Sequence, residues 1–285
     1  MKYVNDVLYH LRHNLRLAAG LVMFGLITLF IFLGPLFVDV KKSDPLSAFP
    51  AQPPSAENPF GTDDQGRDLL AAAVIGVPMT LSVGLIAGVV GVGVGTILGF
   101  VSGYMGGWVD NLIKGIVDTL LTVPSLVVLI SIASIIREAI SIEIMALVVA
   151  SLAWMWPTRT IRAQVLTMRE QSYVQMAKLN GVGTFGIILR ELLPNLLPYL
   201  AVSFVGSVSA AILASIGLEA IGLGPQNEPT LGMTIYWSLQ FNSLFRGLWW
   251  WWGFPIFFIV FLFISLFLIS AGLDQVANPR LRRNS

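Results

Sequence analysis

The sequence contains no cysteine and only 2 histidines among its 285 residues. Disulfide bonds, thiolate catalysis and cysteine-ligated metal centres are therefore excluded. His10 and His13 lie three positions apart, but no third ligand follows them, so we assign no metal site. Charged residues are also scarce, at 12% of the chain against about 25% in soluble domains. A formal net charge of +1 offers no basic surface for nucleic acid.

Long apolar segments take the place of the missing charge. Hydrophobic residues make up 55% of the chain, and a helix needs about 20 apolar residues to cross the hydrocarbon core of a membrane. We therefore predict an all-α integral membrane protein with six transmembrane helices. The expected spans cover residues 17–38, 79–101, 115–136, 144–158, 192–218 and 247–273. The uncharged stretch 69–109 is too long for one span, so part of it is expected to lie at the membrane interface.

The distribution of basic residues sets the expected orientation. With the N-terminus inside, most of the 17 Lys and Arg residues fall in inner segments, as membrane insertion favours. We therefore expect a multi-pass protein of the cell (cytoplasmic or inner) membrane with both termini in the cytoplasm. The segment 45–66 then faces outward, and its prolines disfavour regular structure.

A polar insert interrupts the apolar pattern between the fourth and fifth spans. Residues 171–195 carry two helical patterns, 172–180 and 185–193, separated by Gly181. Glycine is a natural helix stop because it accepts positive φ. Pro194 is expected to end the second helix, since proline disfavours helix at the residue before it. Ordered loops of this length usually have a function, so we predict a cytoplasmic docking handle for a soluble partner.

Several blocks of sequence, in a characteristic order, carry a family resemblance over residues 58–282. The blocks are NPFGTDDQGRDLL at 58–70, GYMGGWVD at 103–110, DTLLTVP at 118–124, QMA at 175–177 and LPN at 193–195 in the insert, GLG at 222–224 and NPRLR at 278–282. With these blocks the chain resembles the C-type permease of dipeptide/oligopeptide/nickel ABC importers.

The resemblance implies a type I ABC importer permease fold with a cytoplasmic coupling helix pair, the EAA motif. Residues 1–68 would hold an N-terminal cytoplasmic segment, a first anchor and the outer segment. Residues 69–285 would form a five-helix permease core with a coupling loop at 159–195. Ala177 is expected to be small so that an ATPase surface can come close. The implied ATPase-coupling residues are Tyr173, Gln175, Ala177, Gly181, Arg190 and Pro194.

The same resemblance implies half of a pathway that works by alternating access. The implied partners are a homologous second permease, two ATP-binding-cassette ATPase subunits and an extracytoplasmic substrate-binding protein. The sequence has no P-loop motif, so ATP and Mg would bind to the partner subunits, with no cofactor on this chain. The expected solute is an oligopeptide. Oligosaccharides, nickel and glutathione are alternatives, because members of similar sequence carry them.

The sequence departs from the family pattern in three places. Gln175 stands where the family usually has glutamate, and Leu231 stands where a tryptophan is common. Ser215 and Glu219 occupy a stretch where the family usually has glutamate first and serine later. The energy source is therefore better supported by the sequence than the cargo is.

Glycines form two further patterns. The sequence GVGTFG at 181–186 matches a dinucleotide-binding pattern, but no strand precedes it, so we assign its glycines to helix capping and spacing. A second set makes a smooth ridge in the second span, which favours close helix packing, with a pore-lining face as the alternative. The ridge consists of Gly84, Gly88, Gly91, Gly95, Gly99 and Gly103.

Two groups of acidic residues have expected structural roles. Those of the outer segment lack the spacing of a calcium-binding loop, so we predict helix caps and turn formers. They are Asp63, Asp64 and Asp68. Asp118 lies within an apolar span, where an ionisable group is costly and needs a partner. We predict a structural ion pair with Arg159 or Arg162.

The tryptophans at 249–252 lie at the outer end of the sixth span. They are interpreted either as an aromatic belt at the headgroup level or as a surface that stacks on a sugar. Both interpretations are open from sequence.

Two other protein classes are weighed. A secondary transporter would show an inverted repeat or ionisable residues in mid-span, and neither is clear. An intramembrane enzyme needs paired catalytic groups, whereas the spans hold Asp118 but no His or Cys. We therefore expect a transport subunit that is not an enzyme. The residues of the substrate pathway are not identified by the sequence.

Overall fold

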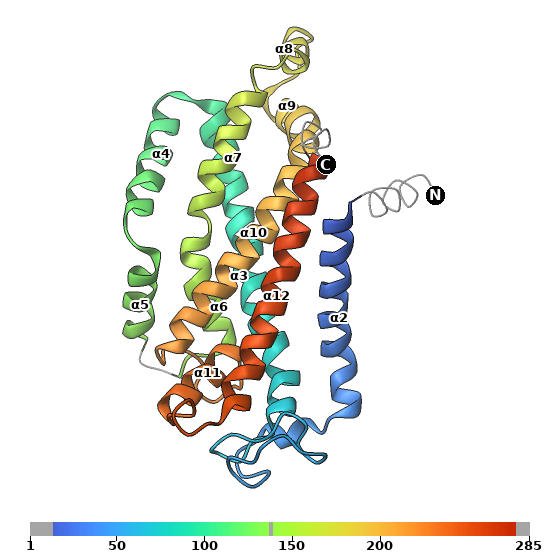
Figure 1. The fold of residues 1–285 in the computed structure, drawn as a ribbon. Coiled ribbons are helices and arrows are strands. Elements are labelled where there is room, and N and C mark those ends of the chain that lie inside the picture. The colour runs from blue at the N-terminus through green and yellow to red at the C-terminus, as the bar shows by residue number, and fades with distance from the viewer. Residues whose placement is uncertain (1–13, 137–138, 278–285) are drawn as a thin grey trace.

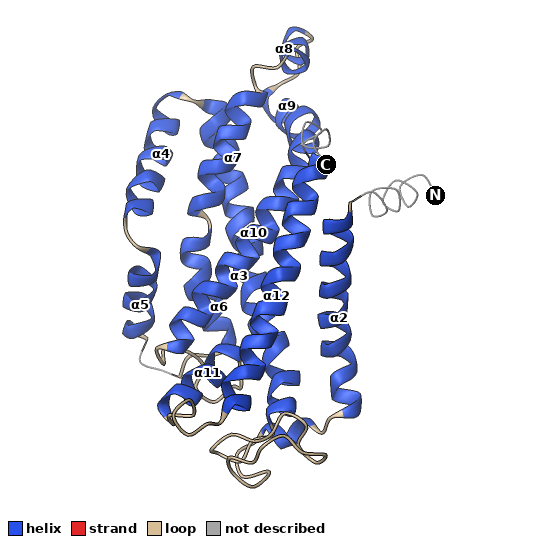
Figure 2. Cartoon of the chain, in the orientation of Figure 1, coloured by secondary structure: helices blue, strands red, loops and turns tan. Residues whose placement is uncertain are grey.

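The computed structural model describes residues 14–136 and 139–277, and over these residues the protein is a bundle of long helices (Figures 1 and 2). No strand occurs in the described ranges, so the predicted all-α fold is confirmed. The helices are α2 (Leu15–Phe37), η1 (Val40–Ser43), α3 (Leu69–Met105), α4 (Gly107–Thr122), α5 (Ser125–Ile135), α6 (Ile142–Ala153), α7 (Met155–Met168), α8 (Ser172–Leu179), α9 (Thr184–Ile187), η2 (Ile188–Leu192), α10 (Leu193–Ala220), α11 (Leu231–Gln240) and α12 (Trp249–Ala277).

The described residues contain five helical segments long and apolar enough to cross a membrane, and a bent pair makes a sixth. The five are Leu15–Phe37, Leu69–Met105, Ile142–Met168, Thr184–Ala220 and Trp249–Gln275. The bent pair is α4 with α5, whose axes meet at 86°. The predicted number of six spans therefore holds when this pair counts as one.

The bend between α4 and α5 lies at Val123 and Pro124, inside the single helix predicted for 115–136. Val123 has an extended backbone, with φ −85° and ψ 131°. Proline disfavours the helical conformation at the residue before it. The third span is therefore a broken helix.

The second and fourth spans are longer than predicted. α3 is one helix of 37 residues, about 55 Å long at 1.5 Å per residue, where we expected a span at 79–101. Its N-terminus is capped by Asp68, whose side chain accepts a hydrogen bond from the Ala71 N–H at 2.8 Å. The fourth span, expected at 144–158, runs through Ile142–Met168 and so includes Arg159 and Arg162. The fourth span is longer than predicted because its helix continues through polar residues after the apolar stretch has ended.

The glycine ridge of α3 is a packing surface. A Cβ atom added at Gly88 would lie 2.6 Å from Val208 Cγ2 of α10, and one added at Gly99 would lie 2.9 Å from Ile161 Cγ2 of α7. The other ridge glycines also meet side chains or backbone of α6, α7 or α10 at close range. The close-packing interpretation is therefore confirmed, and α3 is the central helix of the bundle.

The segment between α2 and α3 is held by hydrogen bonds although it is mostly irregular, as its prolines predict. Figure 1 shows it at the end of the bundle opposite α8. The Leu46 N–H donates to the Gln65 carbonyl at 2.8 Å, and the Ala51 N–H donates to the Asp63 carbonyl at 2.8 Å. Asp63 and Asp68 are buried turn and cap residues, as predicted. Burial raises the pKa of both carboxyl groups.

The tryptophan run packs under this segment. Trp251 is fully buried and Trp250 is 8% exposed, and the Trp250 Nε1 donates to the Thr62 carbonyl at 3.2 Å. Both sequence interpretations, the lipid belt and the sugar platform, are wrong for these two residues. Their burial depends on a segment almost 200 residues away, which the local pattern does not reveal. Trp249 is 55% exposed.

Candidate functional site

The predicted docking insert begins with a separate helix, α8, which projects from one end of the bundle (Figure 1). It ends at Asn180, and Gly181 follows with φ +76°. The Gly181 N–H donates to the Lys178 carbonyl, and the Val182 N–H donates to the Ala177 carbonyl at 3.1 Å. This pair of bonds is a Schellman cap, which favours glycine at this position. The predicted stop at Gly181 is confirmed.

The second predicted helix, 185–193, is wrong in its end point. α9 is followed by a π-helical turn, η2, that continues into α10 without a break. Leu193 is itself helical, with φ −59° and ψ −46°. Pro194 lacks an N–H and would crowd the carbonyl of Arg190 in a regular helix. The wider π turn relieves this conflict. α8 is therefore the one separate helix of the insert.

One face of α8 packs on the bundle. Val174 is fully buried and Ala177 is 8% exposed, within a cluster that includes Ile161, Ile187 and Leu192. The small size of Ala177 therefore lets α8 approach its own chain, and the close approach of an ATPase expected from the sequence stays a prediction. Apolar contacts here join α8 to α7 and α10.

Other side chains tie this end together. Tyr173 is partly buried beside Glu191, and burial, with a smaller effect of the Glu191 charge, raises the pKa of the Tyr173 hydroxyl. Lys178 Nζ lies 5.8 Å from the centre of the Tyr104 ring at the end of α3. Gln175 Nε2 donates to the Arg169 carbonyl at 3.3 Å. Gln175 is exposed, so a partner can reach it.

The opposite face of the insert is exposed and apolar. Met176 is 60% exposed, Phe185 73% and Leu179 83%. We call these three residues the apolar tip. Arg190 and Pro194 are also exposed. Sequence reasoning missed the apolar tip because apolar residues carry no special signal in a chain as hydrophobic as this one.

The predicted ion pair of Asp118 forms with Arg159, with Nε and Oδ1 3.8 Å apart and both side chains largely exposed. The alternative prediction, a pair between Asp118 and Arg162, is wrong. Arg162 binds Asp110 of α4 through two hydrogen bonds, Nε to Oδ1 at 2.5 Å and Nη2 to Oδ2 at 2.6 Å. Such paired bonds are among the stronger polar contacts in proteins.

Two further bonds extend this connection to α3. The Ser102 hydroxyl donates to Asp110 Oδ1 at 2.5 Å, and Arg169 Nη1 donates to the Gly103 carbonyl at 2.8 Å. Arg162 and Arg169 both belong to the end of α7 that leads into α8. Polar contacts therefore connect the end of α7 that leads into α8 with both α3 and α4.

Replacement of Asp110 by alanine should destabilise the protein by about 3 kcal/mol, because it leaves the guanidinium of Arg162 without its carboxylate. Arg162 and Asp110 are 21% and 14% exposed. The matched control is Asp118→Ala, which removes an exposed pair and should cost less than about 1 kcal/mol. Thermal unfolding of the purified variants in nanodiscs measures both. Equal losses of stability would contradict the assignment.

A buried carboxylate joins α10 to α11 near the other end of the bundle. Glu219 is fully buried and accepts hydrogen bonds from Ser215 Oγ at 2.7 Å and from Thr230 Oγ1 at 2.6 Å. The Leu231 N–H donates to Thr80 Oγ1 of α3 at 3.1 Å. The start of α11 is thus fixed to both α10 and α3.

The geometry of this cluster explains one departure from the family pattern. Ser215 and Glu219 are four residues apart and lie on one face of α10, where they bind each other. Because serine and glutamate in either order bring a hydroxyl and a carboxylate to that face, the exchange preserves the polar pair.

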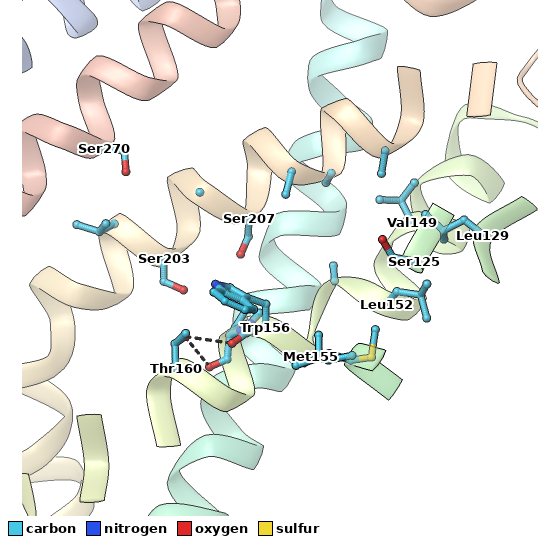
Figure 3. A pocket seen from close by; sticks show the side chains of 18 of the residues that line it. Ser125, Leu129, Val149, Leu152, Met155, Trp156, Thr160, Ser203, Ser207 and Ser270 are labelled. Atoms are coloured by element: carbon cyan, nitrogen blue, oxygen red, sulfur yellow. Dashed lines mark hydrogen bonds between the residues drawn. The ribbon is translucent and has the colours of Figure 1, made fainter. Parts of the chain in front are cut away.

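A cavity of about 580 Å³ lies within the bundle (Figure 3). Its walls come from α4 to α7 and from α10, with Ser270 of α12 at one side. In Figure 3, Trp156 of α7 lies near Ser203 and Ser207 of α10, whose side chains point toward the cavity. None of the lining residues carries a charge at neutral pH. This is a candidate path for a solute through the helical bundle.

Residues 95–283 match the family described as "Binding-protein-dependent transport system inner membrane component". The chain belongs to this family. The matched range contains α8, the Asp110–Arg162 pair, the cavity-lining residues and Glu219.

Named relatives define the type of permease. The dipeptide transport system permease protein of Bacillus subtilis (strain 168) is 31% identical over 283 residues, which cover 99% of this chain and 88% of the relative. The oligopeptide transport system permease protein of Escherichia coli (strain K12) is 33% identical over 272 residues, covering 95% and 89%. The oligopeptide permease protein of Bacillus subtilis is 28% identical over 281 residues, covering 98% and 90%.

These similarities confirm the predicted family, the permease of dipeptide and oligopeptide ABC importers. They also bear out the prediction of a multi-pass inner membrane component that serves transport and is not an enzyme. The secondary-transporter alternative is not favoured. The roles of individual residues in coupling stay predictions.

Proposed function

We propose that this permease carries oligopeptides inward as one half of a pathway, with a homologous second permease as the other half. Two separate ATPase subunits supply the energy from ATP and Mg, and a substrate-binding protein delivers the peptide. The observation that carries the proposal is α8 with its apolar tip, because it is an exposed docking surface joined to three helices of the bundle.

The apolar tip is the proposed contact of the ATPase subunits. Exposed apolar side chains on a projecting helix are a recurring mode of protein recognition. Gln175 and Arg190 supply polar contacts at the edge, while Tyr173, Ala177 and Pro194 maintain the shape of the insert. A push on α8 is passed to α7 and then, through Arg162 and Arg169, to α4 and α3.

The orientation follows from the basic residues at the α8 end, because cytoplasmic segments are rich in Lys and Arg. They are Lys114, Arg159, Arg162, Arg169, Lys178 and Arg190. We therefore place this end and both termini in the cytoplasm. The opposite end, with Leu46 and Phe49 more than 80% exposed, then faces the substrate-binding protein.

A peptide is the proposed cargo because relatives of this permease are named for dipeptide and oligopeptide transport. The observation that favoured an oligosaccharide was the tryptophan run. Trp250 and Trp251 are buried in the chain's own core, so they offer no stacking surface to a sugar.

The test is uptake of a labelled tripeptide and a labelled trisaccharide by source cells with and without this chain, followed by reconstitution in proteoliposomes with ATP and vanadate enclosed. We expect peptide uptake to require the chain and to be abolished by vanadate. Vanadate-insensitive uptake would contradict the ATP-driven mechanism. Loss of sugar uptake alone would overturn the peptide assignment.

A further inference from the structure

We propose that the cavity in Figure 3 is a contact site for the peptide backbone during transport, with Ser203, Ser207 and Trp156 as the residues that touch it. This inference rests on the proposed function and adds the site and its chemistry. It names the feature of the cargo that is recognised, the uncharged amide chain, which all peptides share.

The cavity lacks the groups that would select by charge. Its lining contains no Asp, Glu, Lys, Arg or His. A fixed charge would hold side chains of opposite sign and repel those of the same sign. Nickel needs nitrogen or carboxylate ligands, and no group of three such side chains occurs among the described residues. An uncharged peptide backbone fits this lining, whereas a metal ion does not.

The two serine hydroxyls are free to bind a solute. Serine in a helix commonly donates to the carbonyl four residues back, as Ser209 does to Val205 at 2.9 Å. Ser203 and Ser207 form no hydrogen bond with any described residue, and both point toward the cavity from successive turns of α10. Peptide N–H and C=O groups are suitable partners, because a hydroxyl both donates and accepts.

Trp156 supplies the apolar part of the site. It lies within the Ile142–Met168 span yet is 63% exposed. Its ring is near the serines of α10 in Figure 3. Thr160, one turn further along α7, already donates to the carbonyls of Trp156 and Pro157 at 3.1 and 3.2 Å. The proposed site therefore consists of a flat ring on α7 facing two available hydroxyls on α10.

The first experiment compares the double variant Ser203→Ala and Ser207→Ala with Ser209→Ala in the reconstituted complete importer. Uptake of Ala-Ala-Ala, Ala-Lys-Ala and Ala-Glu-Ala is measured together with ATP hydrolysis in the absence of peptide. We expect kcat/KM to fall about tenfold for all three peptides in the double variant, as for the loss of two neutral hydrogen bonds. The Ser209→Ala variant should match the wild type both in peptide uptake and in ATP hydrolysis.

The outcomes separate this inference from the proposed function. Wild-type uptake that requires ATP, with an unchanged double variant, would overturn the contact site and leave the proposed function intact. A loss confined to one of the charged peptides would also overturn it, because the proposed contact is with the backbone. Failure of the wild type to take up any of the three peptides would instead reject the proposed function.

The native absence of cysteine gives a second measurement. Ser207→Cys introduces a unique thiol into this chain, and labelling by a small methanethiosulfonate reagent reports whether the cavity is open. We expect Ala-Ala-Ala to slow labelling at least about fivefold under turnover, an effect near 1 kcal/mol in binding terms. Cross-linking of this cysteine to the second permease by a thiol-to-amine reagent, with no protection by peptide, would identify the cavity as a subunit interface and overturn the site.

Discussion

Gly181→Val should separate ATP hydrolysis from peptide uptake while the permease still assembles. Gly181 has φ +76°, which a β-branched residue adopts at a cost on the order of 1–3 kcal/mol. No atom lies within 4 Å of an added Cβ, so the strain is in the backbone and not in packing. The Schellman cap at the end of α8 is then lost, and the apolar tip turns away from its docking position. We expect peptide transported per ATP hydrolysed to fall about tenfold, as for a change of 1.4 kcal/mol in coupling.

Gly183→Val is the matched control for this experiment. The control makes the same glycine-to-valine change two residues away. The space around an added Cβ at Gly183 is equally open, but the backbone there is extended, with φ −68°. Valine is allowed in this conformation. Full coupling in the Gly183 variant and loss in the Gly181 variant would support α8 as the coupling element. Full uptake with Gly181→Val would refute it.

Glu219→Ala should produce the largest loss of stability of any single change considered. It leaves the hydroxyls of Ser215 and Thr230 without their acceptor and opens a void between α10 and α11. We expect a loss of about 3–5 kcal/mol, the size found when one partner of a buried polar or charged pair is removed. The measurement is thermal unfolding in nanodiscs, with protease accessibility of residues 221–230 as a local readout.

The rescue variant is Ser215→Glu combined with Glu219→Ser, which restores the order usual in the family. Both positions lie on one face of α10, so the carboxylate can still receive the Thr230 hydroxyl from the neighbouring turn. We expect the double variant to recover at least half of the stability that Glu219→Ala loses. A double variant as unstable as Glu219→Ala would show that the carboxylate must come from position 219.

The sequence predicts local features of this permease well. The membrane spans, the helix stop at Gly181, the cap at Asp68 and the packing ridge of α3 follow from properties of neighbouring residues. The second span extends beyond 79–101 because the whole apolar stretch from Leu69 to Met105 forms one continuous helix, much of which is covered by protein. The break expected at Pro194 failed because a π turn accommodates the missing N–H.

The candidate site, too, was predictable from the sequence only in part. Asp118 was expected to pair with Arg159 or Arg162. It pairs with Arg159, whereas Arg162 binds Asp110, 52 residues away in sequence and one helix across in space. Burial of Trp251 likewise depends on the outer segment packing over α12. The distances between side chains on neighbouring helices decide which of several plausible partners a residue contacts. These distances cannot be read from residue type or spacing in the sequence.

The amino-acid sequence by itself determined the membrane environment, the helical class, the family and the place of the polar insert. These follow from hydrophobic length, glycine and proline positions and ordered motifs, all of which act along the chain. Only the tertiary structure decided which face of α8 is free, which carboxylate holds Arg162 and that α7 and α10 line an uncharged cavity. The physical reason is that burial and pairing are properties of side chains brought together from distant segments, and packing in three dimensions selects among partners that the sequence leaves equivalent.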